Sequence, residues 1–355
     1  MLTLFLVACQ PPSLPVTDAP PSDTVDTVDT SDTEDSGDPS GCEASGWTSG
    51  RYDMDHGGVE RTFRVHVPEG YDPANPAPLV VAFHGWGGDG TEFVGSSVVT
   101  GQADERGYVV IAPVGLGSGQ PDQSWNSWSF RGSTTGIGGD GEPICDDAAT
   151  TDYDYDSCDG VSENGCSWTH CQDDDVDFAV ELVALAKENL CIDPERVFAV
   201  GGSNGGMFSW ELGQNEASAS TFRAIAPLIG LPHRGYLNPP ARDGGMPVLS
   251  ITGMGDRTVP PGEWEDPAYT TTTDGDAYYY TGATGITQVW AEAQGCDVTQ
   301  PAAVVDVGVS EVECRSYCAG DGAWPPVLDC RSEMGHTYQF SWSWPLILDF
   351  FDQVE

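Results

Sequence analysis

One serine stands among four glycines in the segment GGSNGG, residues 201–206. Ser203 fits the pattern G-x-S-x-G, in which a serine on a sharp turn between a strand and a helix acts as a nucleophile. The preceding RVFAVGG has the composition of a buried strand, and the following NGGMFSWELG begins a helix. This context predicts a nucleophile at Ser203. A purely structural Gly-rich turn is the alternative.

A nucleophilic serine needs a base and a group that orients the base, and after a strand–turn–helix elbow these follow in the order acid, histidine. Asp256 comes just after the apolar segment PVLSITG, where the loop leaves a predicted strand. Among the six histidines, only His336 is both late in the chain and in a loop before a final helix. We therefore expect Asp256 and His336 to complete a catalytic triad. The alternative is that both are ordinary loop residues.

Acyl transfer also needs two backbone donors for the oxyanion that develops on the substrate. The N–H of Asn204, directly after the serine, is the first candidate. The second is the N–H of Trp86 in HGWGG, residues 84–88, where glycines allow the backbone to approach a ligand closely. A plain Gly-rich turn at 84–88 is the alternative.

These residues need a scaffold that alternates strands and helices. Apolar runs typical of buried parallel strands occupy 78–85, 108–115, 196–202, 224–230 and 247–253, and an alternating run at 61–68 predicts a strand with one exposed face. Helices are predicted at 176–190, from 207, at 284–295 and at 343–354. The pattern predicts an α/β fold with a central sheet between two layers of helices.

Residues 132–172 interrupt this pattern with four cysteines, many aspartates and little periodicity. A loop of this length inside a compact domain is usually functional, so we expect a disulfide-linked surface insertion that acts as a lid or a binding loop. Closely spaced carboxylates at Asp152, Asp154 and Asp156 are the ligands that Ca²⁺ prefers, although the EF-hand spacing is missing. A solvated acidic loop without a metal is the alternative.

The N-terminus predicts export. Residues 1–9 end in Leu-Val-Ala-Cys, which resembles a bacterial lipobox with Cys9 as the lipidated residue, although the segment is short and lacks a basic start. A chance apolar start is the alternative. Residues 10–46 are rich in Pro, Ser, Thr and Asp and predict a disordered acidic tether. The catalytic domain would then span 47–355.

Eleven cysteines agree with export. Without Cys9, ten remain, enough for five disulfides in an oxidising compartment. Spacing does not determine their pairing, but we expect the last four to pair among themselves. Zinc is a weaker alternative, because no C-x-x-C pair is present.

The chain carries 56 acidic and 13 basic residues, a formal net charge of −43. Such a surface repels nucleic acids and anionic lipids, so we expect neither as a partner, and membrane contact only through a lipid anchor. We expect a monomer that requires no cofactor, with calcium as the one option.

In the segments that carry the predicted triad and its scaffold, the chain resembles the secreted α/β-hydrolase esterases of the polyhydroxybutyrate depolymerase and feruloyl esterase group (carbohydrate-esterase 1-like, LpqC-type). The resemblance covers about residues 61–351. It rests on VVAFHGWGG, DDVDFAVELV, CIDPERVFAVGGSNGGMFSWELG, PVLSITGMGDRTVP and GHTYQF. It implies an α/β-hydrolase fold, a mostly parallel sheet with helices on both faces, and a triad at Ser203, Asp256 and His336. The chain departs from the group at Thr252-Gly253-Met254, where His-Gly-Thr is usual, and in its Cys-rich insertion.

Aromatic residues are expected to wall the substrate pocket: Trp125 and Trp128 after one strand, and Tyr338 after His336. Core packing is the alternative for each of them. Aromatic walls suit a feruloyl group, a sugar ring or an apolar polyester. We therefore expect hydrolysis of feruloyl or acyl esters of plant polysaccharide such as xylan. The alternatives are polyhydroxybutyrate depolymerisation, a serine peptidase, and a non-catalytic glycan-binding lipoprotein on a decayed hydrolase.

Overall fold

The structure is a computed structural model that describes residues 46–117, 125–146, 155–162, 164–172, 175–265, 269–271, 277–318 and 324–354. All of these belong to one of the two units into which the chain divides, residues 40–355. The predicted signal at 1–9 and all but the last residue of the predicted tether at 10–46 lie outside the described residues. No helix in the described ranges is long and apolar enough to cross a bilayer.

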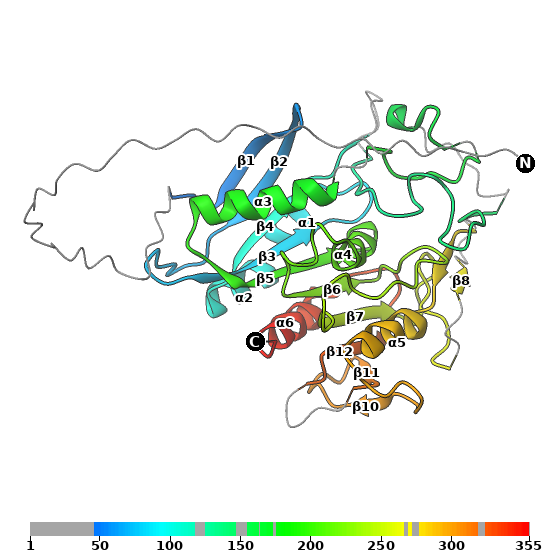
Figure 1. Ribbon diagram of the computed structural model, residues 1–355. Coiled ribbons are helices and arrows are strands. Elements are labelled where there is room, and N and C mark those ends of the chain that lie inside the picture. The colour runs from blue at the N-terminus through cyan, green and yellow to red at the C-terminus, as the bar shows by residue number, and fades with distance from the viewer. Residues whose placement is uncertain are drawn as a thin grey trace, which may run out of the picture. The chain divides into compact units, whose positions relative to one another are not determined.

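The centre of the fold is a ten-stranded sheet in the order β1-β2-β4-β3-β5-β6-β7-β12-β11-β10 (Figure 1). The middle strands, from β4 to β12, pair in parallel, and two strands at each edge pair antiparallel. A separate hairpin joins β8 and β9. The strands are β1 Gly50–His56, β2 Val59–His66, β3 Ala77–Phe83, β4 Val109–Pro113, β5 Ile192–Gly202, β6 Ala224–Leu228, β7 Val248–Gly253, β8 Tyr269–Thr271, β9 Tyr279–Thr281, β10 Ala303–Val305, β11 Glu313–Ser316 and β12 Val327–Ser332.

Helices cover both faces of this sheet. Successive residues of β3 alternate between two apolar cores, because side chains along a strand point to opposite faces. One core contains residues of α3, α4 and α5, and the other contains residues of α1, α2 and α6. The helices are α1 Thr91–Val94, α2 Ser97–Arg106, α3 Asp175–Asn189, α4 Asn204–Gln214, α5 Ala283–Ala293 and α6 Phe340–Phe351, with a short 3-10 turn at Asp156–Cys158.

The predicted α/β architecture is confirmed, with the six predicted strands and four predicted helices each present. The sequence analysis did not predict β1, the hairpin β8–β9, β10, β11, the buried strand β12, or the helices α1 and α2. The edge strand β10 is three residues long, and β1 lacks a buried residue. Short, polar edge strands carry little apolar periodicity, so their sequence resembles that of loops.

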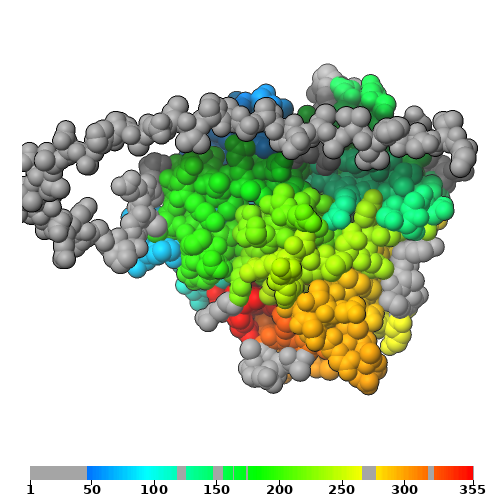
Figure 2. All heavy atoms as spheres, viewed as in Figure 1, coloured from blue at the N-terminus to red at the C-terminus, as the bar shows by residue number. Residues whose placement is uncertain are grey.

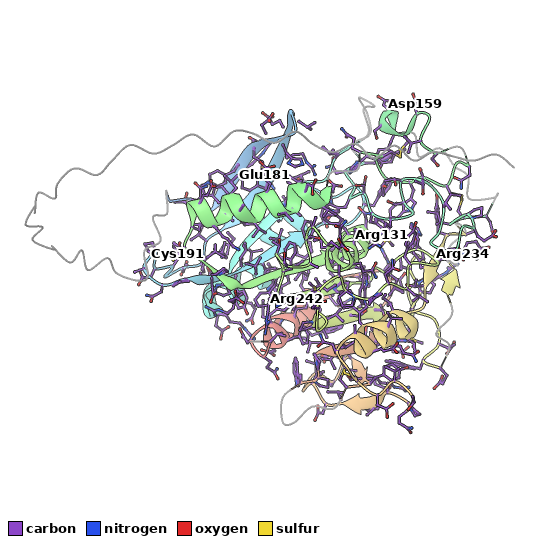
Figure 3. The ribbon with its side chains drawn as sticks, in the orientation of Figure 1. Arg131, Asp159, Glu181, Cys191, Arg234 and Arg242 are labelled. Atoms are coloured by element: carbon purple, nitrogen blue, oxygen red, sulfur yellow. A yellow bond between two sulfur atoms is a disulfide. The ribbon has the colours of Figure 1, made fainter. Side chains whose placement is uncertain are left out.

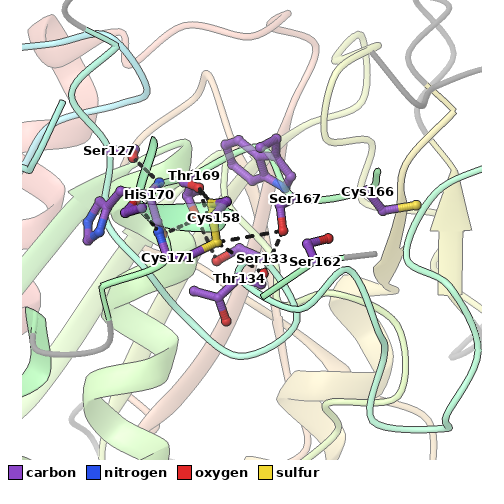
Figure 4. The surroundings of a disulfide bond; sticks show 12 residues. Ser127, Ser133, Thr134, Cys158, Ser162, Cys166, Ser167, Thr169, His170 and Cys171 are labelled. Carbon is purple, nitrogen blue, oxygen red and sulfur yellow. Dashed lines mark hydrogen bonds between the residues drawn. A yellow bond between two sulfur atoms is a disulfide. The ribbon is translucent and has the colours of Figure 1, made fainter. Parts of the chain in front are cut away.

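Two disulfides hold the insertion, Cys145–Cys166 and Cys158–Cys171. Figure 4 shows Cys171 beside Thr134 and Ser167, so this disulfide lies against the start of the insertion as well as its end. Arg234, labelled in Figure 3, ties the insertion to the loop after β6 by an ion pair with Asp140 (Nε–Oδ2 2.9 Å).

The four C-terminal cysteines pair among themselves as predicted, Cys296–Cys318 and Cys314–Cys330. The second of these joins neighbouring positions of β11 and β12. All nine cysteines in the described ranges are disulfide-bonded, which excludes a zinc site built on free thiolates there.

Candidate active site

Ser203 occupies a strained turn at the end of β5. Its φ of 54° and ψ of −116° lie outside the regions that non-glycine residues normally adopt. A side chain at Gly201 would place Cβ 1.9 Å from the carbonyl oxygen of Gly205, and one at Gly205 would place Cβ 2.1 Å from that of Phe83. The G-x-S-x-G pattern therefore reflects backbone segments that approach too closely for any other residue.

The structure brings Ser203, His336 and Asp256 together. Nε2 of His336 lies 2.8 Å from Oγ of Ser203, and Nδ1 lies 2.7 Å from Oδ2 of Asp256. Ser203 follows the carboxyl end of β5, Asp256 that of β7 and His336 that of β12, and these strands lie within the run β5-β6-β7-β12 of the sheet. Carboxyl ends of parallel strands meet at one edge, so residues up to 133 positions apart become neighbours.

The carboxylate of Asp256 is held in one orientation. Its Oδ1 accepts hydrogen bonds from the backbone N–H groups of Thr258 (2.8 Å) and Val259 (2.9 Å). Its side chain has 0% exposure, whereas that of His336 is 28% exposed. A carboxylate can only accept, so His336 donates from Nδ1 and its Nε2 is left to accept the proton of Ser203.

The loop after β3 is fixed by the buried imidazole of His84. Its Nδ1–H donates to the carbonyl of Gly85 at 2.6 Å, and its Nε2 accepts from the N–H of Gly115 at 2.9 Å. This loop carries Trp86, the predicted second oxyanion donor, into the wall of the cavity that contains Ser203. Asn204, the predicted first donor, is the first residue of α4, where backbone N–H groups have no partner within the helix.

The side chain of Asn204 has a structural role that its sequence position did not suggest. Its Oδ1 accepts from the backbone N–H of Trp128 at 2.7 Å, and its Nδ2 donates to the carbonyl of Trp128 at 3.0 Å. These two hydrogen bonds hold the loop after β4 against the first residue of α4. Asparagine is suited to the position because its amide offers one acceptor and one donor side by side.

The cavity around Ser203 has a volume of about 590 Å³, and five Trp and Tyr side chains form part of its walls. Trp86 and Trp168 line it together with three tyrosines, Tyr278, Tyr280 and Tyr338. Trp168 belongs to the insertion, and the indole N–H of Trp86 donates to Tyr155 Oη (2.8 Å), also in the insertion. The insertion thus builds part of the cavity wall, in agreement with its predicted role as a binding loop.

The buried side chain of His233 contacts two of the aromatic residues in this wall, Trp168 and Tyr280. Nε2 of His233 accepts from the indole N–H of Trp168 at 3.0 Å, and Nδ1–H donates to the carbonyl of Tyr279 at 3.2 Å. Its ring stacks on Phe130 and on Tyr280, with centroids 5.2 and 5.0 Å apart. The aromatic side chains therefore sit on a fixed support.

Of the three predicted wall aromatics, only Tyr338 lines the cavity. The prediction for Trp128 was wrong: the side chain has 0% exposure and packs against Phe83 and Phe208 below the elbow. Trp125 lies one layer behind the wall, 5.3 Å from Trp86 between ring centroids. Trp125 and Trp128 differ in burial, and the local sequence QSWNSWSF does not indicate which of the two is buried.

Sequence reasoning missed Glu92, the one acidic residue among those lining the cavity. Its Oε2 accepts from the hydroxyl of Tyr338 (3.1 Å) and from the backbone N–H of Gly85 (3.3 Å). Burial raises the pKa of Glu92, and these two donors partly oppose that effect. The sequence shows only an acidic residue in the first turn of a short helix. Trp168, Tyr278 and Tyr280 were missed too, and the run YYY at 278–280 was the available signal.

The acidic insertion gives no indication of a metal site in the part that is described. The predicted calcium ligands Asp152 and Asp154 lie outside the described residues. Asp156 is exposed in the 3-10 turn. Among the residues that the structure describes, no group of three or more His, Cys, Asp or Glu could hold a metal ion.

The two buried histidines predict a loss of stability in mild acid. Burial lowers the pKa of His84 to about 4 and that of His233 to about 3. In the unfolded chain both titrate near their ordinary value of about 6.5, so below that pH the unfolded state binds more protons. The free energy of unfolding should fall by roughly 3 kcal/mol per pH unit between about pH 6 and pH 4.

Urea unfolding from pH 7.5 to 4.5 measures this slope. His233→Gln keeps a neutral donor and acceptor and should reduce the slope to about half. A free energy of unfolding that stays constant from pH 7 to pH 5 would contradict the assignment.

No protein-family model matches the chain. The candidate esterase NocK of Nocardia uniformis subsp. tsuyamanensis is 28% identical over 57% of this chain and 47% of its own length. Feruloyl esterase C of Emericella nidulans is 25% identical over 56% of each chain. The chain thus spans about half the length of the curated relatives it matches.

Solved structures identify the fold. The acetyl xylan esterase from Aspergillus awamori aligns with 85% of this chain and 99% of its own, with a TM-score of 0.52 and 15% sequence identity. At that level of identity the likeness concerns architecture alone. Together with the parallel sheet centre, the helices on both faces and the serine elbow after β5, it identifies an α/β-hydrolase fold with a disulfide-linked insertion.

Proposed function

We propose that the chain is a serine carboxylic-ester hydrolase that uses Ser203, His336 and Asp256 as its catalytic triad. The observation that supports this is the continuous hydrogen-bond chain from Ser203 Oγ through His336 to Asp256, at 2.8 and 2.7 Å. A non-catalytic protein has no reason to keep three such groups aligned above a strained turn. The esterase names of the two similar curated proteins agree with this activity.

The proposed reaction is a two-step acyl transfer. His336 Nε2 takes the proton of Ser203 as Oγ attacks the ester carbonyl, and the alcohol leaves with that proton. Water then hydrolyses the acyl-enzyme with the same histidine as base. Asp256 stabilises the imidazolium that forms in each step. We assign the oxyanion to the N–H groups of Asn204 and Trp86, which belong to the elbow and to the loop held by His84.

We propose feruloyl or acyl esters of plant polysaccharide as substrates. The cavity of about 590 Å³ offers two indole and three phenol rings, which suit a flat aromatic acyl group. The names feruloyl esterase C and acetyl xylan esterase belong to similar proteins and point in the same direction. The apolar side chains of Met207, Ile229 and Val259 in the same cavity favour polyhydroxybutyrate as the second candidate.

Two measurements test this assignment. A fluorophosphonate probe should label the native chain at Ser203, whereas a decayed hydrolase would stay unlabelled. Turnover of methyl ferulate well above that of methyl acetate, with no clearing of a polyhydroxybutyrate film, would support the aromatic ester. Film clearing without ferulate turnover would favour the polyester, and cleavage of peptide substrates alone would indicate a peptidase.

We further propose that the protein is exported and held by a lipid on Cys9, with residues 10–46 as its tether. The disulfides of the described domain support an oxidising compartment. Radiolabelled palmitate incorporated into the native chain and not into a Cys9→Ser variant would support the anchor. A monomer that needs no cofactor, with calcium as the one option, remains our proposal for the working state.

Glu92 should make the enzyme discriminate against anionic substrates. The half-buried Glu92 lines the same cavity as Ser203, and its carboxylate repels a second negative charge there. We expect Glu92→Gln to raise kcat/KM for 4-nitrophenyl hemisuccinate about tenfold relative to 4-nitrophenyl butyrate at pH 8, because the variant lacks the carboxyl group.

The exposed substitution Glu188→Gln on α3 is the matched control and should leave the ratio of the two kcat/KM values unchanged. Equal ratios for Glu92→Gln and the native enzyme would show that Glu92 does not set this selectivity.

A further inference from the structure

A second cavity lies between α5 and the strands β10–β12, separate from the one that contains Ser203. Its volume is about 350 Å³, and it shares no lining residue with the catalytic cavity. The segment around it, residues 277–316, forms the orange part of the surface in Figure 2. The disulfides Cys296–Cys318 and Cys314–Cys330 cross-link the same region.

The ionic groups of this cavity are already paired with one another. Asp329 accepts from Nε (3.1 Å) and Nη2 (2.7 Å) of Arg331, and their side chains are only 7% and 1% exposed. Arg315, at the mouth, pairs with Glu313 at 2.7 Å. Arg315 also lies 4.0 Å from Glu265, an exposed lining residue, so each cation already has a carboxylate partner and an anionic ligand would gain little from the site.

Hydrogen-bonding capacity nevertheless remains. Each oxygen of Asp329 accepts one hydrogen bond from Arg331 and keeps a further lone pair. Burial raises the pKa of Asp329, so an added donor would stabilise its ionised form. Arg315 offers donors at the rim, and Thr287, Gln288 and Gln300 add hydroxyl and amide groups. The cavity therefore offers both donors and acceptors.

Two aromatic side chains, Trp264 and Tyr317, also line the cavity. The Trp264 ring lies under two guanidinium groups, with centroid distances of 4.1 Å to Arg315 and 3.8 Å to Arg331. Arg331 also donates to Thr284 Oγ1 at 2.6 Å and to the carbonyl of Gly262 at 2.8 Å. The second ring, Tyr317, lies on the β11 side. These contacts hold the aromatic surface rigid before any ligand arrives, which lowers the cost of binding.

We propose that this cavity is a binding site for a sugar unit of a neutral glycan. The hydroxyl groups of a sugar would donate to Asp329 and accept from Arg315, while its C–H groups pack against Tyr317 and the part of Trp264 that the two guanidinium groups leave uncovered. A neutral polyol matches a site whose cations are already paired and which offers spare donors and acceptors and aromatic side chains. A fatty acyl chain would leave the polar groups unpaired, and an anionic sugar would meet Asp329.

The loop that follows the catalytic acid links the two cavities. Asp256 orients His336, Thr258 and Val259 line the catalytic cavity, and Trp264 lines the second one. Pro261 in its middle is held to α5, because its carbonyl accepts from Ala283 N–H at 2.9 Å. If the chain hydrolyses glycan esters, a glycan held in the second cavity would be bound at the far end of the loop that begins at Asp256. This last step rests on the proposed function, whereas the binding itself does not.

Calorimetric titration of the full chain carrying Ser203→Ala tests the proposal without interference from hydrolysis. The probes are xylohexaose, cellohexaose and mannohexaose, with hexagalacturonic acid as the charged comparison. Ala302→Trp fills the cavity from its lining without removing a polar group, and Ala302→Ser is the matched small control. Thermal unfolding of each variant verifies that it is folded.

We expect saturable binding of a neutral hexasaccharide that Ala302→Trp weakens at least tenfold and Ala302→Ser leaves unchanged. Any one of three results would overturn the proposal: no neutral hexasaccharide binds, folded Ala302→Trp binds as tightly as Ala302→Ser, or hexagalacturonic acid binds best. Because the titration uses an inactive serine variant, its outcome is independent of whether the chain hydrolyses esters.

Discussion

Replacing Ser203 with alanine should reduce kcat for 4-nitrophenyl acetate by roughly 10⁵- to 10⁶-fold, because the attacking oxygen is removed while the oxyanion donors remain. The residual rate over water would come from those donors and from substrate binding alone. Steady-state kinetics with enzyme concentration verified by active-site titration of the parent measure this loss.

The substitution should not weaken the fold. The strained φ of 54° at position 203 is a backbone property that alanine shares, and the lost hydrogen bond joins two partly exposed groups. We expect the melting temperature to stay within a few degrees of that of the parent. A variant that unfolds would leave the kinetic result open, and fluorophosphonate labelling of the parent, with the modified residue found by mass spectrometry, then decides the role of Ser203.

Ser250 on β7 provides the matched control. Its side chain is fully buried, and within the described ranges its hydroxyl has no hydrogen-bond partner. Ser250→Ala should therefore retain kcat and leave the protein as stable or slightly more stable, since it removes an unsatisfied buried polar group. If Ser203→Ala keeps more than a hundredth of the parent kcat, the assignment of the nucleophile is wrong.

Replacing Asp256 with asparagine should reduce kcat about 10⁴-fold while leaving KM nearly unchanged. The reason lies in the two N–H groups, of Thr258 and Val259, that bind Oδ1. They require an oxygen, so the asparagine amide must turn its NH₂ toward His336. Nδ1 then becomes an acceptor, the proton moves to Nε2, and Nε2 can no longer take the proton of Ser203.

A second carboxylate tests whether the effect is specific to this geometry. Asp243 is exposed, and Asp243→Asn should leave kcat unchanged. A loss smaller than tenfold for Asp256→Asn, with the fold intact, would show that the tautomer of His336 does not depend on this carboxylate. A large rise in KM with unchanged kcat would likewise contradict the role assigned to it.

The elements that position the site were readable from the sequence because their signals are local. A strand such as β3 is a continuous apolar run, and α3 repeats its apolar residues at helical spacing. The glycines around Ser203 report close backbone contacts within one turn, so the elbow is encoded by its own few residues. The order of these elements along the chain then predicts that Ser203, Asp256 and His336 reach the same edge of the sheet.

The walls of the cavity could not be predicted in this way. Trp128 and Trp125 lie three residues apart in one loop, yet the first is buried under the elbow and the second packs behind Trp86. The actual wall comes from Trp168 in the insertion and from tyrosines before α5, which tertiary contacts with His233 hold in place. Such contacts join segments far apart in the sequence, and no local pattern records them.

The sequence by itself determined the fold class, the nucleophile elbow and the identity of the triad candidates, because periodicity, steric exclusion and chain order act within short segments. Only the tertiary structure decided which aromatics face the substrate, that Glu92 lies beside Ser203, and that a second cavity exists behind the loop of the catalytic acid. Burial and pairing depend on the packing of distant segments, and the free energy of that packing is a property of the whole fold.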